Sequence, residues 1–171
     1  MNGIEIHPFK PFVPDNAVKL ILGSFPGREQ TQIEQNENDW FYGSKRNQFW
    51  DIISQAYNTP LLTKADKQEL FKRNGIAITD IFLKVRRTEN NNLDNNLEVI
   101  EFNELAIRTI LQNNNINTIL FTSKFVQQHF HKLLPQFTNT VCLPSPSPRY
   151  ASMRKAEKIR HYKNILLKNE L

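Results

Sequence analysis

Four short apolar runs divide the chain, and each has the length of a buried strand. They occupy residues 18–22, 76–82, 118–122 and 140–143. Runs of about four to eight apolar residues are typical of strands that are covered on both faces of a sheet. The pattern therefore predicts four interior strands.

Between these runs, apolar residues recur at helical spacing. The clearest examples are Phe49, Ile52, Ile53 and Ala56, then Leu105, Ile107, Ile110 and Leu111, and finally Met153, Ala156, Ile159, Tyr162, Ile165 and Leu166. Strands that alternate with helices imply a mostly parallel sheet with helices on both faces. We predict an α/β fold, a three-layer α/β/α arrangement around a central, mostly parallel four-stranded sheet.

The chain has 171 residues and contains neither internal repeats nor a domain-scale linker. This length suits one domain with a two- or three-layer core, so we expect residues 1–171 to form a single domain. The asparagine-rich stretch 90–96 is the best candidate for a flexible loop.

The net charge and the apolar content of the chain indicate which kinds of partner it binds. A net charge of +5 and a pI near 9.4 favour a polyanionic partner. No apolar run approaches the roughly 18 residues of a membrane span and the N-terminus lacks a signal-peptide pattern, so we expect a cytoplasmic protein that uses no membrane.

The sequence contains few side chains in a pattern that could ligate a metal ion or an iron–sulfur cluster. Cys142 is the only cysteine, so neither a disulfide nor a four-thiolate iron–sulfur cluster can form within the chain. His129 and His131 are two residues apart, which places them on different faces of a helix. We expect no metal, no iron–sulfur cluster and no other cofactor.

Glycines and polar residues follow the predicted strands. The segment Gly23-Ser24-Phe25-Pro26-Gly27 ends the first run, Asp80 lies near the end of the second, Lys124 follows the third, and residues 143–148 follow the fourth. Ligands bind at the carboxyl ends of the strands in such sheets, which predicts a site at this edge. The alternative is that each block is an ordinary turn.

Four blocks carry a resemblance to a known family. They are Gly23-Ser24-Phe25-Pro26-Gly27, then Tyr42-Gly43 with Arg46-Asn47-Gln48-Phe49-Trp50, then Gly75-Ile76-Ala77-Ile78-Thr79-Asp80-Ile81, and last Leu143-Pro144-Ser145-Pro146-Ser147-Pro148. In this order they resemble the uracil-DNA glycosylase superfamily, most closely its hypoxanthine-DNA glycosylase branch. The single cysteine excludes the branches that contain an iron–sulfur cluster.

The resemblance implies a monofunctional DNA glycosylase of base-excision repair. Such an enzyme hydrolyses the N-glycosidic bond of a deaminated base, hypoxanthine or uracil, and leaves an abasic site in DNA. We expect the partner to be DNA that contains a damaged or deaminated base, and we expect a monomer.

The resemblance also implies a base-binding set made of Gly23, Ser24, Phe25, Pro26, Gly27 and Tyr42. Phe25 could stack on the flipped base while backbone N–H groups of its turn donate to the base carbonyl oxygens. Several relatives carry an aspartate or asparagine in place of Phe25 to orient water. The resemblance assigns this role to Asn47; the alternative is that Asn47 caps a helix that begins near Gln48.

Asp80 has three interpretations. Deaminated bases carry a ring N–H where adenine and cytosine carry an acceptor, so an acceptor-only carboxylate would select them. A carboxylate near the departing base anion would also raise the barrier, unless it is protonated or lies nearer the sugar cation. Otherwise Asp80 is a strand-end residue that is paired with Arg86 or Arg87.

The proline-rich segment Ser145-Pro146-Ser147-Pro148-Arg149-Tyr150 resembles the loop that, in this superfamily, grips phosphates and fills the gap left by the flipped base. The predicted DNA-binding set is Lys124, Ser145, Ser147, Arg149 and Tyr150, with the last two as wedge candidates. Leu143 replaces a histidine of uracil-directed relatives and cannot donate to the leaving base. The alternative is an ordinary surface turn. From Lys158 onward, we expect the basic residues to form a solvated face of the last helix.

Two other functions fit the same residues. One is a non-catalytic nucleic-acid-binding domain on the same fold, which would keep Phe25 and the basic residues. The other is a hydrolase of free nucleosides, which would need no phosphate grip and would show little salt dependence.

Overall fold

The computed structural model describes residues 3–33 and 36–168. Its central sheet has four strands in the order β3 (Ile76–Asp80), β2 (Lys19–Gly23), β6 (Thr118–Phe121) and β7 (Thr140–Cys142), and every neighbouring pair is parallel. These strands coincide with the four predicted runs. The predicted parallel sheet is confirmed.

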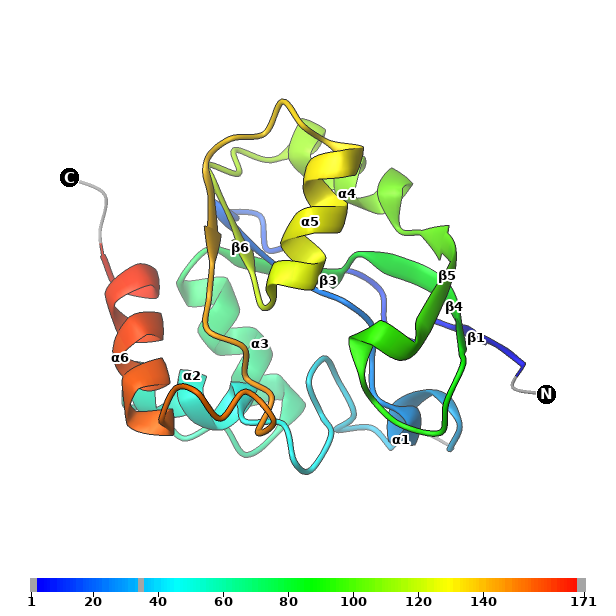
Figure 1. Cartoon of the computed structure of the whole chain (residues 1–171). Helices are drawn as coiled ribbons and strands as arrows, with labels where there is room; N and C mark the ends of the chain where they lie inside the picture. The colour runs from blue at the N-terminus through cyan, green and yellow to red at the C-terminus, as the bar shows by residue number, and fades with distance from the viewer. Residues whose placement is uncertain (1–2, 34–35, 169–171) are drawn as a thin grey trace.

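Successive residues of each strand enter two different cores. Ile21, Ile78 and Leu120 face a core built with α2 (Phe49–Tyr57), α3 (Lys64–Arg73) and α6 (Lys155–Leu166). Their strand neighbours Leu20, Ala77 and Ile119 face a core with α4 (Glu104–Asn113) and α5 (Lys124–Leu133). Because both faces are covered, the strands are apolar throughout. Figure 1 shows the two groups of helices on opposite sides of the sheet, as the three-layer prediction requires.

A second sheet was not predicted. It has three antiparallel strands in the order β1 (Ile4–Ile6), β4 (Phe82–Arg87) and β5 (Leu97–Phe102). The apolar run 76–82 is split at Ile81, where β3 ends and the chain passes into β4. β5 mixes half-buried and exposed residues, so it lacks the continuous apolar signal of an interior strand.

The helices predicted from apolar spacing are present as α2, α4 and α6, although Met153 precedes α6. The predicted loop 90–96 contains the short 3₁₀ helix η1 (Asp94–Asn96), and it is anchored to the chain that follows β2. Asn92 Oδ1 accepts from the backbone N–H of Arg28, which begins α1 (Arg28–Thr31). Within the described ranges, every helix is too short or too polar to span a lipid bilayer.

Gly75 lies directly before β3, and its backbone conformation predicts how a substitution there changes stability. Its φ is +61°, and a Cβ there would lie 2.6 Å from the backbone oxygen of Asn16. We expect Gly75→Ala to lower the free energy of unfolding by about 1–3 kcal/mol, because it adds both left-handed strain and a clash with rigid backbone.

Urea denaturation measures this change. Gly3→Ala is the matched control, since a Cβ at Gly3 has nothing within 4 Å. Equal unfolding free energies for the two variants would contradict the strain argument.

Candidate active site at the carboxyl edge of the sheet

Gly23 ends β2 and lies beside Asp80, which ends β3, as its partner across the sheet. A Cβ at Gly23 would lie 2.2 Å from Tyr42 Oη and 2.4 Å from Asp80 Oδ1. Any side chain would displace both groups. The glycine therefore lets a tyrosine hydroxyl and a carboxylate meet against the backbone at the strand ends.

Tyr42 has an unusual backbone and an enclosed hydroxyl. Its φ is +57°, in the left-handed region, and its ring stacks on Phe49 with the centroids 4.1 Å apart. Tyr42 Oη is 2.8 Å from Thr122 Oγ1, just beyond β6. Burial, with a further contribution from the Asp80 charge, raises the pKa of Tyr42 well above its usual value. The hydroxyl is therefore neutral across the physiological range.

Asp80 is paired with a histidine. Its side chain is 6% exposed, and Oδ2 lies 2.8 Å from His7 Nε2. The predicted pairing with Arg86 or Arg87 is wrong, because both arginines lie on β4 and pair with the strands beside it. Arg86 binds Glu98 on β5, and Arg87 binds Glu5 on β1.

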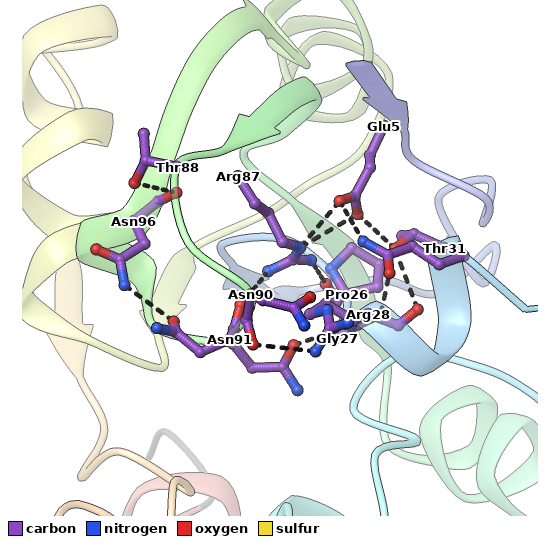
Figure 2. A network of polar contacts seen from close by, with 12 residues as sticks. Glu5, Pro26, Gly27, Arg28, Thr31, Arg87, Thr88, Asn90, Asn91 and Asn96 are labelled. Carbon is purple, nitrogen blue, oxygen red and sulfur yellow. Dashed lines mark hydrogen bonds and ion pairs between the residues drawn. The ribbon is translucent and has the colours of Figure 1, made fainter. Parts of the chain in front are cut away.

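The turn 23–27 is held by side chains from the second sheet. Arg87 is buried, donates from Nη2 to Pro26 O at 2.6 Å, and places its guanidinium 5.9 Å from the centre of the Phe25 ring. Figure 2 shows Arg87 between Glu5 and Pro26, with Arg28 and Asn90 close by. A buried cation thus fixes the turn that carries Phe25.

The loop 90–96 adds an acidic group to the same turn. Ser24 Oγ donates to Asp94 Oδ1 at 2.7 Å. Burial raises the pKa of Asp94, the Ser24 hydrogen bond opposes this change, and the nearby Asp80 charge adds to it. Sequence reasoning missed Asp94, because it treated the asparagine-rich stretch only as a loop.

Asn47 lies just before α2. Its Oδ1 accepts from the backbone N–H of Phe49 at 2.8 Å, so the contact expected of a helix-capping asparagine is present. The position directly before the helix is occupied by Gln48, whose side chain makes no capping bond. A carbonyl oxygen has a second lone pair, so this contact leaves Asn47 able to accept from water. Its catalytic role stays a prediction.

The proline-rich loop, residues 144–150, packs beside Asn47. Gln48 N–H donates to Pro146 O at 3.0 Å, and the Tyr162 hydroxyl donates to Pro144 O at 2.9 Å. Ser145 Oγ accepts from Ser147 N, and Ser147 Oγ accepts from Arg149 N. A hydroxyl that accepts one N–H can still donate its own proton, for example to a phosphate oxygen.

The expected exposure of Lys158 is wrong. Lys158 was expected on a solvated face of α6, but only 1% of the residue is exposed. Its Nζ donates to Ser147 O at 3.0 Å and to Gln48 Oε1 at 3.3 Å, and lies 5.4 Å from the centre of the Tyr150 ring. Burial lowers the pKa of Lys158. The loop folds over this part of α6, which the helical pattern alone could not indicate.

The remaining predicted residues lie at the surface. Arg149 is exposed, Tyr150 is 40% exposed, and Lys124 is exposed at the first position of α5, just after β6. In the described ranges, no group of three or more His, Cys, Asp or Glu side chains could hold a metal ion. Two open cavities of about 380 and 480 Å³ occur elsewhere, and no predicted site residue lines either.

Contacts join most of these residues into one arrangement. Tyr42 lies against Gly23, and its ring stacks on Phe49. The backbone N–H of Phe49 binds Asn47. The next residue, Gln48, binds the backbone of the proline-rich loop. The arrangement combines an aromatic ring at a glycine turn, a buried carboxylate, an amide and an exposed basic loop. Such a set can hold a planar heterocycle and a neighbouring phosphate.

Comparison with known proteins gives concordant matches. Residues 10–169 match the family model described as the uracil DNA glycosylase superfamily. A hypoxanthine DNA glycosylase from Methanosarcina barkeri (strain Fusaro) is 30% identical over 118 residues, which cover 68% of this chain and 70% of that protein. A solution NMR structure of a candidate uracil DNA glycosylase from Methanosarcina acetivorans has a TM-score of 0.72 at 24% identity, over 95% of this chain and 99% of that one, and confirms the fold.

Lys158 provides a test of how the proline-rich loop is held. Lys158→Met keeps the apolar stem but removes the donors to Ser147 O and Gln48 Oε1. We expect the backbone amide hydrogens of Ser147, Arg149 and Tyr150 to exchange about tenfold faster or more, the scale of one lost hydrogen bond to a charged group.

Hydrogen exchange measured by NMR checks this expectation. Lys163→Met is the control, since Lys163 is exposed on the same helix. If the loop exchanges at the same rate in both variants, Lys158 does not hold it.

Proposed function

Because the chain belongs to the uracil DNA glycosylase superfamily, we propose that it is a monofunctional DNA glycosylase that removes a deaminated base, hypoxanthine or uracil, from DNA. Water cleaves the N-glycosidic bond and an abasic site remains. The observation that carries the proposal is the meeting of Tyr42 Oη and Asp80 Oδ1 against Gly23, directly before the Phe25 turn. The proposal treats residues 1–171 as one functional domain that acts as a monomer on damaged DNA.

Base selection in this proposal rests on the turn and on Asp80. The flipped base stacks on Phe25, and backbone N–H groups of residues 23–27 donate to its carbonyl oxygens. Asp80 Oδ2 is engaged with His7, so Oδ1 is the atom that accepts from the ring N–H of a deaminated base. Adenine and cytosine present an acceptor at that position, and two acceptors repel.

Water positioning falls to Asn47. The Phe49 N–H fixes the orientation of the amide, and the second lone pair of Oδ1 accepts from the attacking water. An amide has no basicity at neutral pH, so Asn47 orients water rather than deprotonating it. An oxocarbenium-like sugar is reactive enough for neutral water to attack.

The departing base must be stabilised without a histidine, since Leu143 is apolar and buried. The donors that this chain offers are the backbone N–H groups of the turn and the neutral hydroxyl of Tyr42. The raised pKa of Tyr42 keeps its proton in place while negative charge develops on the base.

In this proposal, DNA is contacted by Lys124 and by residues of the proline-rich loop. The hydroxyls of Ser145 and Ser147 donate to phosphate oxygens, and Lys124 adds charge at the same edge of the sheet. Arg149 and Tyr150 lie at the exposed end of the proline-rich loop, where one flat side chain can fill the gap left by the flipped nucleotide.

Single-turnover excision from oligonucleotides that contain hypoxanthine, uracil or only normal bases tests this proposal. We expect excision of at least one deaminated base and none of normal bases. Asn47→Ser keeps an acceptor for Phe49 N–H but removes the amide, so it should lower excision by roughly 100-fold while leaving stability close to wild type. Asn47→Ala should lose the same activity and about 1 kcal/mol of stability as well.

A folded Asn47→Ser protein that excises at the wild-type rate would limit Asn47 to its capping contact. DNA affinity should change little in either variant, because the lost contact is to water. This separates a catalytic defect from a binding defect.

Arg149→Ala tests the proline-rich loop. If Arg149 binds a phosphate, the variant should bind every sequence more weakly and reduce the salt slope by about one. If Arg149 is the wedge, the slope should stay the same while excision from duplex falls more than excision from single strands.

Arg73→Ala is the matched control. Arg73 is an exposed arginine at the end of α3, which leads into the start of β3 at the opposite edge of the sheet. If the two variants have the same affinity, salt slope and strand preference, the proline-rich loop does not contact DNA.

A further inference from the structure

The segment 44–48 lies between the turn that follows β2 and the proline-rich loop. At one end, a Cβ on Gly27 would lie 3.5 Å from Ser44 Cβ, so this segment contacts the turn. At the other end, Gln48 N–H donates to Pro146 O at 3.0 Å. Figure 1 shows the chain just before α2 beside the proline-rich loop. The segment therefore connects the part of the site proposed to hold the base with the part proposed to hold phosphate.

Backbone contacts hold this segment in a tight turn. Asn47 N–H donates to Ser44 O at 2.9 Å, which closes the turn around Lys45 and Arg46. Asn47 Oδ1 also accepts from Phe49 N–H at 2.8 Å, and this contact joins the turn to the start of α2. The backbone of the two basic residues is thus positioned before any ligand binds.

The side chains of Lys45 and Arg46 are exposed at this turn. Within the described ranges, neither side chain makes a hydrogen bond or an ion pair. Arginines elsewhere on the surface do pair, since Arg73, Arg86 and Arg108 each bind a glutamate. The turn therefore presents two positive charges that no ion pair of the described residues offsets.

We propose that Lys45 and Arg46 form a phosphate-binding site for the damaged strand of DNA; this proposal rests on the proposed glycosylase function. A flipped nucleotide that places its base at the turn after β2 and its phosphate at the proline-rich loop must cross the segment between them. Both cations lie within two residues of Asn47, so at most about 7 Å of backbone separates them from the residue proposed to orient water. The site therefore binds the phosphodiester groups that flank the damaged nucleotide.

The two side chains suit this ligand. The guanidinium of Arg46 can bind two phosphate oxygens at once, and the ammonium of Lys45 acts as a point charge. Glu29, whose carboxylate lies beside Gly27, binds Asn92 rather than either cation. Phosphate contacts carry no sequence information, and these contacts need only the damaged strand. Single-stranded and duplex DNA should therefore use the site alike.

DNA affinity measured over a range of salt concentrations tests the site. The probes are a duplex and a single strand, each with one tetrahydrofuran analogue of an abasic site, so that binding is measured without excision. Lys45→Ala and Arg46→Ala should each weaken binding of both probes by about tenfold at low salt and reduce the salt slope by about one. Arg46→Lys should keep the wild-type slope, because it keeps the charge.

Lys132→Ala and Arg73→Ala are the matched controls and should bind as wild type does. Lys132 is exposed near the end of α5, and Arg73 is exposed at the end of α3. If the Lys45 and Arg46 variants bind both probes as the controls do, the proposal is overturned. A loss confined to the duplex would also overturn it, because such a loss places the contact on the complementary strand.

Uncharged methylphosphonate linkages, introduced one at a time on the damaged strand, identify the phosphate. Replacing a contacted linkage should weaken binding by the wild type. The double variant Lys45→Ala/Arg46→Ala should lose no further affinity at that linkage, since the partner charges are already absent. If the losses from variant and linkage simply add at every linkage that flanks the abasic analogue, the two residues bind no phosphate there and the proposal is overturned.

These measurements separate the phosphate site from the proposed function. A wild-type protein that binds in this way but excises no base would contradict the glycosylase function, and the phosphate site would stand. A wild-type protein that excises a deaminated base, with Lys45 and Arg46 variants that bind as the controls do, would contradict the phosphate site alone.

Discussion

The site depends on the absence of a side chain at Gly23. Tyr42 Oη and Asp80 Oδ1 occupy the volume that a Cβ would need, so the hydroxyl, the carboxylate and the end of β2 pack directly together. This contact explains the left-handed backbone of Tyr42, which turns its ring toward the strand end and onto Phe49. Phe49 in turn begins the helix that orients Asn47. The missing side chain at Gly23 thus relates the proposed base-binding turn to the residue proposed to hold water.

Two buried cations hold the loops that flank this contact. Arg87 reaches from β4 to the backbone of Pro26, and Lys158 reaches from α6 to the backbone of Ser147. Burying a charge is costly unless it is hydrogen-bonded, and each of these cations has a carbonyl and a second partner. Arg87 has Glu5, and Lys158 has Gln48. Loops held in this way are positioned before a substrate arrives, which lowers the entropic cost of reaching a reactive geometry.

Local patterns predicted the parallel sheet, which the structure confirms, and the place of the candidate site, because buried strands are continuous apolar runs and parallel strands present their carboxyl ends at one edge. Gly23 and Asp80 were found on this ground. The sheet β1-β4-β5 was missed because β5 is partly exposed and has no apolar run. The His7–Asp80 pair joins residues 73 positions apart, and Lys158 is buried by a loop distant in sequence. No local spacing encodes such contacts; they become visible once the fold is known.

The most direct test of the account is to identify the products formed from a duplex oligonucleotide with a single hypoxanthine or uracil, using mass spectrometry. The account predicts free deaminated base and an otherwise intact strand with one abasic site, formed by wild-type protein without added metal. An unchanged oligonucleotide bound by the protein would contradict catalysis and favour a binding domain. A strand cut at the abasic site by the protein itself would contradict the monofunctional mechanism, in which water attacks the sugar.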